Sequence, residues 1–172
     1  MGGCYARDTL GVENPRVGLL NIGSEDAKGN ELVRRTHDLF RASALDFVGN
    51  VEGQEIFTGV ADVIVCEGFV GNVVLKVAEG AGDFLLGLFA KELGARSPDL
   101  AREVVPRVAR RLDYTERGGA LLLGVEGIVL IGHGRSDGKA IASAVREAAQ
   151  CVRVGVNRDI VSGLRGIAGR VA

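Results

Sequence analysis

Asp62-Val-Ile-Val-Cys-Glu-Gly-Phe-Val-Gly-Asn-Val-Val-Leu-Lys76 is the stretch that decides the expected fold. Residues 61–66 form an apolar, β-branched run without polar alternation, which is typical of a strand buried on both faces of a parallel sheet. Gly68 and Gly71 then predict a tight turn, and apolar residues recur at helical intervals directly after it. Asn72 occupies the expected N-cap position, where its side chain caps the helix or leaves the backbone amides open to an anion. The stretch therefore predicts a strand, a turn and a helix, with both uses of the turn open.

Further strands and helices are predicted on both sides of this stretch. Buried strands are expected at 16–22, 45–51 and 127–132, and helices at 2–10, 30–44, 54–57, 73–93, 98–112, 137–155 and 156–164. Pro98 suits the first position of a helix, so about 73–112 is predicted to form a helical hairpin. Strands that alternate with helices predict an α/β protein with a mainly parallel, doubly wound sheet, and 172 residues suit a single domain.

Composition excludes several classes of function. With 21 basic and 22 acidic residues, the net charge of −1 gives no general attraction for nucleic acid. The three cysteines are widely separated and show no CxxC spacing, so neither a disulfide framework nor a zinc site is expected. A reducing, cytoplasmic location is the simpler expectation. No apolar run is long enough to span a membrane.

Four predicted loops follow strands and are therefore expected to meet. They are residues 23–29, 49–53, 68–72 and 132–136. Because the carboxyl ends of parallel strands share one edge of a sheet, ligands usually bind there. The groups expected at this edge are Gly23, Lys28, Gly29, Asn50, Gly68, Gly71, Asn72 and His133. Amides, an ammonium and carboxamides of this kind hold phosphate and stabilise an oxyanion during acyl or phosphoryl transfer.

Individual residues leave alternatives open. Lys28 is either a ligand for an anion or a solvated loop lysine, and His133 is either a general acid–base or a turn histidine bound to a backbone carbonyl. Cys66, inside an apolar strand, is expected to be a packed thiol, and His37 is expected to be solvated on a polar helix face. The arginines of 98–112 suit a solvated face, or a surface for an acidic carrier protein or anionic lipid.

Five segments of the sequence, spread over nearly the whole chain, resemble the PlsX family of bacterial phosphate acyltransferases. They are Asn14-Pro-Arg-Val-Gly-Leu-Leu-Asn-Ile-Gly23, Lys28-Gly-Asn-Glu-Leu32, Phe47-Val-Gly-Asn-Val-Glu-Gly53, residues 61–75, and Gly132-His-Gly134 with Ser136-Asp137. The resemblance implies a cytoplasmic homodimer that transfers an acyl chain from acyl carrier protein to inorganic phosphate, without a cofactor or metal, for phospholipid synthesis. It also implies a fold like that of phosphotransacetylases and isocitrate or isopropylmalate dehydrogenases.

The resemblance carries over to particular residues. Lys28 and Asn72 match positions that are implicated in activity, and the predicted hairpin matches the part of the family where peripheral membrane contact is placed. Because phosphate attacks the thioester itself, such an enzyme needs positioning and charge stabilisation and no nucleophile of its own. Glu67 stands where the family usually has Asp, and Leu121 where it commonly has Pro.

Family members also have an amino-terminal half that precedes these five segments, so the chain is expected to be the carboxyl-terminal part of a longer enzyme. Two other functions stay open. One is a non-catalytic remnant that serves as a dimerisation, carrier-protein or membrane-surface binding module. The other is a dehydrogenase on the related fold. The lack of a GxGxxG motif after the first strand counts against this second function.

Overall fold

The computed structural model describes residues 1–112, 118–134 and 136–171, with side chains described as far as residue 165. The chain divides into two compact units, and each is described by itself. The first unit comprises Met1–Cys66, Leu121–Leu130 and Arg146–Ala172, and the second comprises Glu67–Ala120 and Ile131–Val145.

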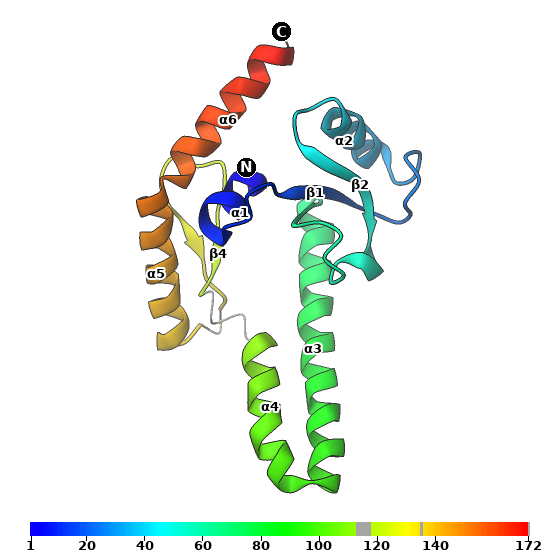
Figure 1. Ribbon diagram of the computed structural model, residues 1–172, viewed down its shortest axis with the longest axis vertical. Coiled ribbons are helices and arrows are strands. Elements are labelled where there is room, and N and C mark those ends of the chain that lie inside the picture. The colour runs from blue at the N-terminus through cyan, green and yellow to red at the C-terminus, as the bar shows by residue number, and fades with distance from the viewer. Residues whose placement is uncertain (113–117, 135, 172) are drawn as a thin grey trace. The chain divides into compact units, whose positions relative to one another are not determined.

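Helices and strands alternate along much of the chain, as predicted (Figure 1). The first unit holds α1 (Gly2–Leu10), β1 (Arg16–Asn21), α2 (Glu31–Arg41), β2 (Asp46–Glu52), the short 3-10 helix η1 (Gly53–Glu55), β3 (Val63–Val65) and α6 (Val156–Val171). The second unit holds α3 (Gly68–Arg96) and α4 (Pro98–Leu112). Parts of β4 (Ala120–Leu121), β5 (Leu130–Ile131) and α5 (Gly138–Val154) belong to each unit.

The first unit is built on a parallel sheet with strand order β2-β1-β3. Val17 and Leu19 of the central strand and Val51 of β2 are buried, as expected for apolar runs of this kind. The register between β1 and β2 shifts after Val17, so that Gly18 pairs with Gly49. Gly49 has a φ of 95°, which a residue with a Cβ rarely adopts. The prediction of an α/β protein with parallel strands is confirmed.

Arg16 and Asp62 tie the start of β1 to the segment before β3. The Arg16 backbone N–H and its Nε donate to the Asp62 carboxylate at 2.9 and 3.0 Å, and the Asp62 N–H donates to the Arg16 carbonyl at 2.9 Å. The hydrogen bond from the Arg16 guanidinium lowers the pKa of Asp62, and the Arg16 N–H bond acts in the same direction. This pair fixes the approach of the stretch that leads into α3.

The predicted last strand does not join the parallel sheet. Of residues 127–132, Leu130–Ile131 form β5, which pairs with β4 in a separate two-stranded sheet. Gly124 and Gly127, with φ of 88° and 110°, turn the chain between these two strands. The apolar run therefore finds a local partner, and the prediction that the loop at 132–136 follows a strand of the parallel sheet is wrong.

A second cluster of buried side chains in the first unit lies where α1 packs against α6. Its buried members are Cys151, Val156 and Ile160. Partly buried side chains packed against them are Cys4, Tyr5, Leu121, Leu123, Ile128 and Val154. Gly11, with a φ of 74°, ends α1 in the left-handed conformation that the sequence predicted for a helix stop.

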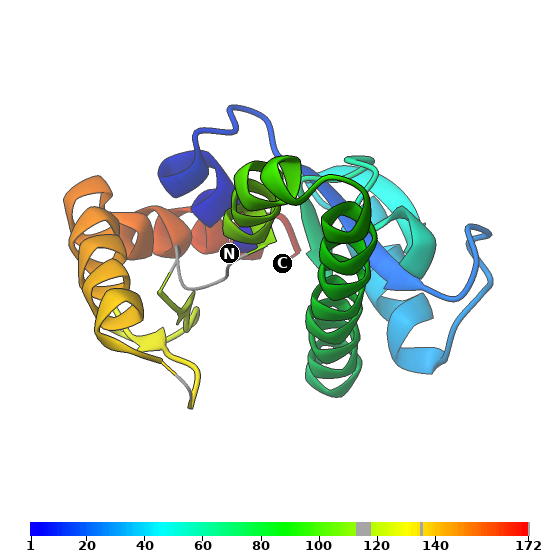
Figure 2. The same cartoon turned by 90° about the horizontal axis from the view of Figure 1, so that it is seen from below.

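The second unit contains two long helices that pack against each other. Both views show α3 and α4 side by side, with the chain reversing between them at Ser97 (Figures 1 and 2). The Ser97 N–H donates to the Leu93 carbonyl at 2.8 Å and closes α3. None of the 29 residues of α3 is buried. Within the described residues, no helix is long and apolar enough to cross a membrane.

Candidate functional site

The loop that carries Lys28 is held by two asparagines from neighbouring strands. Asn21, at the end of β1, donates from Nδ2 to the Lys28 carbonyl at 3.1 Å. Asn50 of β2 donates from Nδ2 to the Glu25 carbonyl at 2.9 Å. Within the loop, the Lys28 N–H donates to the same Glu25 carbonyl at 3.1 Å. The parallel arrangement of β1 and β2 therefore brings Asn50 to the loop that carries Lys28. The prediction that Asn50 lies in a loop at 49–53 is wrong, because β2 continues to Glu52.

Two glycines make the tight course of this loop possible. A Cβ on Gly23 would lie 2.8 Å from Glu25 Oε2 and 3.1 Å from Lys28 Cγ. Gly29 has a φ of 86°, and a Cβ there would lie 2.6 Å from Asn21 Oδ1. A side chain at Gly29 would thus meet both backbone strain and a clash with the asparagine that anchors Lys28.

The ammonium of Lys28 forms a long, weak ion pair with Glu25. Its Nζ lies 3.8 Å from Glu25 Oε1, and the two side chains are 51% and 66% exposed. An exposed ion pair of this length contributes about 0–1 kcal/mol, because water screens both charges. The loop therefore presents a positive charge that an anionic ligand could engage at low cost.

The start of α3 differs from the prediction. The helix begins at Gly68, and the side chain of Glu67 acts as its N-cap by accepting hydrogen bonds from the Phe69 and Val70 N–H groups. The predicted turn over 68–72 is absent, and Asn72 is an exposed residue inside the first turns of α3. The prediction that Asn72 caps the helix is therefore wrong, because the Glu67 carboxylate takes that place.

Gly71 is part of the same helical turn. Its N–H donates to the Glu67 carbonyl at 2.9 Å, as in a regular helix. Neither Gly68 nor Gly71 has a positive φ. Their backbone amides are thus oriented along the helix, and two of the amides next to them are satisfied by the chain's own carboxylate.

His133 lies against α3 within the second unit. Its Nε2 is 3.3 Å from Nζ of Lys76, which also donates to Glu79 Oε2 at 2.9 Å. Ser136 fixes the backbone of the turn, since the His133 N–H donates to Ser136 Oγ at 3.0 Å and the Ser136 N–H donates to the His133 carbonyl at 2.9 Å. The histidine is thus held between a capped turn and a lysine of α3.

Lys76 is a functional candidate that the sequence interpretation missed. It stands four residues after Asn72 on α3, a spacing that places both residues on one face of the helix. This four-residue spacing is the signal in the sequence that identifies Lys76. The second unit therefore combines a carboxamide position, an ammonium and an imidazole along the first turns of α3.

The predicted site residues fall into two groups in different units. Gly23, Lys28, Gly29 and Asn50 lie together in the first unit, and Gly68, Gly71, Asn72 and His133 belong to the second. Within the described part of the chain, no three or more His, Cys, Asp or Glu side chains are grouped to hold a metal ion.

Two other sequence interpretations are wrong. His37 was expected to be solvated, but its side chain is 2% exposed and packs edge-on against Phe47 with ring centroids 5.1 Å apart. Cys66 was expected to be packed in the sheet, but it is exposed just beyond the end of β3. His37 is buried because Phe47 of β2 packs against its ring, and Cys66 is not packed in the sheet because β3 ends at Val65.

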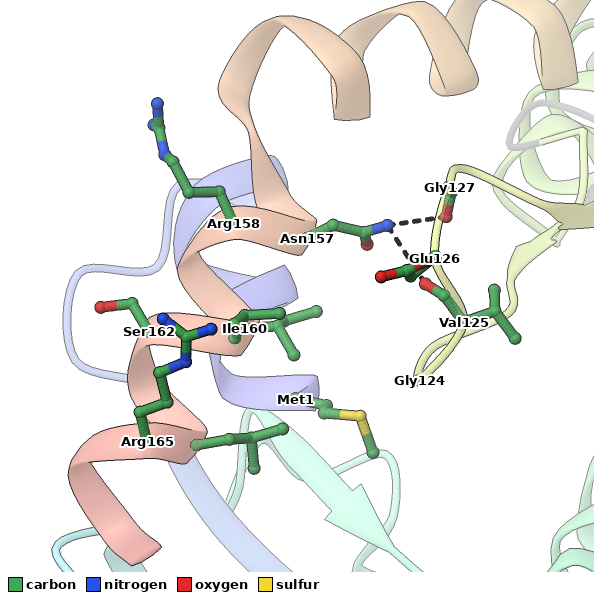
Figure 3. Close-up of a pocket in the computed structure, with 12 residues that line it drawn as sticks. Met1, Gly124, Val125, Glu126, Gly127, Asn157, Arg158, Ile160, Ser162 and Arg165 are labelled. Atoms are coloured by element: carbon green, nitrogen blue, oxygen red, sulfur yellow. Dashed lines mark hydrogen bonds between the residues drawn. The ribbon is translucent and has the colours of Figure 1, made fainter. Parts of the chain in front are cut away.

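A pocket of about 590 Å³ in the first unit has none of the predicted site residues in its lining (Figure 3). It is lined by Met1, by the loop at 124–127 and by residues of α6. Asn157 of α6 shapes it by donating from Nδ2 to the carbonyls of Val125 at 3.3 Å and Gly127 at 2.7 Å. Arg158 and Arg165 also line this pocket.

Comparison with known proteins places the chain among proteins of lipid metabolism. A family model described as "Fatty acid synthesis protein" matches residues 1–159. The chain is 46% identical to a phosphate acyltransferase of Dictyoglomus turgidum, over 99% of this chain and 52% of the relative. It is 47% identical to the phosphate acyltransferase of Nitratidesulfovibrio vulgaris, over 95% and 49%, and 49% identical to that of Desulfitobacterium hafniense, over 93% and 50%. The chain thus spans about half the length of the curated relatives that it matches.

Proposed function

We propose that this chain, which belongs to the fatty acid synthesis protein family, carries the part of a phosphate acyltransferase that binds inorganic phosphate and the acyl donor. The enzyme moves a fatty acyl chain from acyl carrier protein to phosphate and releases an acyl phosphate for phospholipid synthesis. The observation that carries this proposal is the family match together with the exposed ammonium of Lys28, in a loop whose Lys28 and Glu25 carbonyls accept hydrogen bonds from Asn21 and Asn50 of two parallel strands.

The chemistry needs few groups from the protein. A phosphate oxygen attacks the thioester carbonyl, the carbonyl oxygen gains negative charge, and the thiolate of the carrier leaves. Lys28 holds phosphate by charge, and Asn72 donates from its amide to the oxyanion or to phosphate. His133 and Asn50 complete substrate binding with the backbone around Gly23, Gly29, Gly68 and Gly71.

The architecture and setting of the enzyme belong to the same proposal. The parallel sheet is part of a doubly wound sheet like that of isocitrate or isopropylmalate dehydrogenases and phosphotransacetylases, in a single domain. The enzyme is a homodimer in the cytoplasm, and the α3–α4 hairpin contacts the inner face of the membrane.

The test is phosphate-dependent loss of the acyl carrier protein thioester in the presence of this chain. Lys28→Ala should abolish the phosphate-dependent rate, because the charge that holds phosphate is lost. Lys91→Ala is the matched control, since Lys91 is an exposed lysine near the far end of α3 and should leave the rate unchanged. A folded chain that shows no thioester loss with phosphate present would refute catalysis by this chain.

A second candidate function is a binding module without turnover, and the exposed apolar surface of α3 favours it. Leu75, Val77 and Phe84 are 62%, 64% and 69% exposed, and the arginines of α4 lie beside this helix. Such a surface suits self-association, a carrier protein or an anionic membrane. Flotation with anionic vesicles that is lost when α3–α4 is replaced, together with zero turnover, would favour this candidate.

A further inference from the structure

A charged cluster joins α2 to the loop that carries Lys28. Asp26, in that loop, is bound through one carboxylate oxygen by Nη2 of Arg41 at 2.7 Å. Its other oxygen, Oδ1, lies 3.3 Å from Nε2 of His37. Both partners belong to α2, so the carboxylate connects the loop to that helix.

The imidazole of His37 is buried and incompletely satisfied. Its side chain is 2% exposed, yet its Nε2 makes no hydrogen bond in the described part of the chain, although it faces Asp26. Buried polar atoms are almost always paired, and an unpaired one destabilises the fold. A ring with a proton on Nε2 would satisfy this atom by donating to Asp26 Oδ1, which lies 3.3 Å away.

Asp26 lies between the two points at which the loop is already anchored. Asn50 holds the Glu25 carbonyl and Asn21 holds the Lys28 carbonyl. A third anchor at Asp26 restrains the residues between these two points. The loop is therefore restrained at Glu25, at Asp26 and at Lys28, whose N–H also donates to the Glu25 carbonyl.

We propose that His37 and Arg41 are positioning residues for Lys28, which they serve by holding Asp26 and so fixing the loop. The inference rests on the proposed function, because the role of Lys28 in binding phosphate does. The charged groups that face this imidazole are Asp26 from the loop, and Asp38, with Oδ1 4.0 Å from Nδ1, and Arg41 from α2. The neighbour from β2 is Phe47, which is uncharged.

The test measures hydrogen exchange of the Lys28 amide in the 172-residue chain, because that amide is bonded only while the loop is closed. Asp26→Asn should speed its exchange by about two- to fivefold, as expected when a partly exposed ion pair is lost. Asp26→Glu should restore part of the protection. Asp38→Asn is the matched control, since it removes a carboxylate near the same ring without touching the loop, and it should leave the exchange unchanged.

Variants of the two α2 residues separate positioning from a merely structural role. His37→Gln and Arg41→Gln each remove one contact to Asp26, so each should speed exchange of the Lys28 amide. Amides in the interior of α2 should keep their protection in Arg41→Gln, because Arg41 is an exposed residue at the end of that helix.

Equal Lys28 exchange in Asp26→Asn, Asp38→Asn and the unaltered chain, with the fold intact by circular dichroism, would overturn the proposal. So would Lys28 exchange that is unchanged in both His37→Gln and Arg41→Gln. Exchange requires no turnover, so this outcome is distinct from failure of the proposed function, which would appear in the thioester assay.

Discussion

Replacing Glu67 with alanine tests how the start of α3 is built. Glu67 Oε2 accepts from the Phe69 N–H at 2.9 Å, and Oε1 accepts from the Val70 N–H. Loss of an N-cap side chain costs about 0.5–2 kcal/mol, and loss of a negative charge at the positive end of the helix dipole adds about 0.3–1 kcal/mol. Because the site is exposed to solvent, the lower part of each range applies, and we expect a total of about 1–2 kcal/mol.

The assay is amide hydrogen exchange at Phe69 and Val70. A loss of about 1–2 kcal/mol corresponds to exchange that is about 5- to 30-fold faster at these two amides. The effect should stay within the first turn, because the remainder of this 29-residue helix keeps its internal hydrogen bonds. Glu67→Asp should retain protection, since aspartate is a preferred N-cap residue.

Glu92→Gln, near the far end of α3, is the control for loss of a negative charge on the same helix. It should leave Phe69 and Val70 unchanged. If these two amides exchange equally fast in Glu67→Ala and in the unaltered chain, the carboxylate is not the cap, and the original assignment of Asn72 would return.

Two more predictions concern pH and thiol reactivity. The pKa of Asp62 is lowered in the fold by Arg16, so the pair stabilises the protein above the ordinary aspartate pKa of about 4 and this stabilisation is lost as pH falls through the lowered value. Acidification should therefore lower the melting temperature of Asp62→Asn by less than it lowers that of the unaltered chain. Equal decreases in melting temperature would contradict the pairing. Burial raises the pKa of Cys151, which is 0% exposed, whereas Cys66 is exposed. Cys66 should react first with a thiol reagent in the folded chain and Cys151 only on unfolding, and Cys66→Ser should remove the fast phase.

The parallel sheet could be predicted because burial on both faces leaves a clear mark in the sequence. The strands expected at 16–22 and 45–51 correspond closely to β1 and β2. The run at 127–132 has the same apolar character, yet it pairs locally with β4. An apolar run shows that a strand is buried, but the choice of partner depends on the turn before it, here at Gly124 and Gly127.

The site was predictable where residues follow strands and unpredictable where contacts come from elsewhere in the chain. Lys28 and Asn50 were brought together by the parallel order of β1 and β2 alone. Two glycines close together suit a turn or a helix equally well, so the sequence could not decide whether Glu67 or Asn72 caps α3. His37 was misjudged because the residues that bury it lie on another strand and in the loop before its helix.

Both elements that the proposed reaction would use for an anion already face a carboxylate of this chain. Lys28 Nζ lies 3.8 Å from Glu25 Oε1, and both side chains are half or more exposed. Phosphate that replaced Glu25 as the partner of Lys28 would therefore break an ion pair worth at most about 1 kcal/mol. Glu67 instead accepts two backbone N–H groups directly, a cap whose loss is expected to cost about 1–2 kcal/mol. A phosphate dianion at the same amides would break those bonds and would also be repelled by the released carboxylate. Under the proposed function, phosphate is therefore expected at the Lys28 loop and not at the first amides of α3.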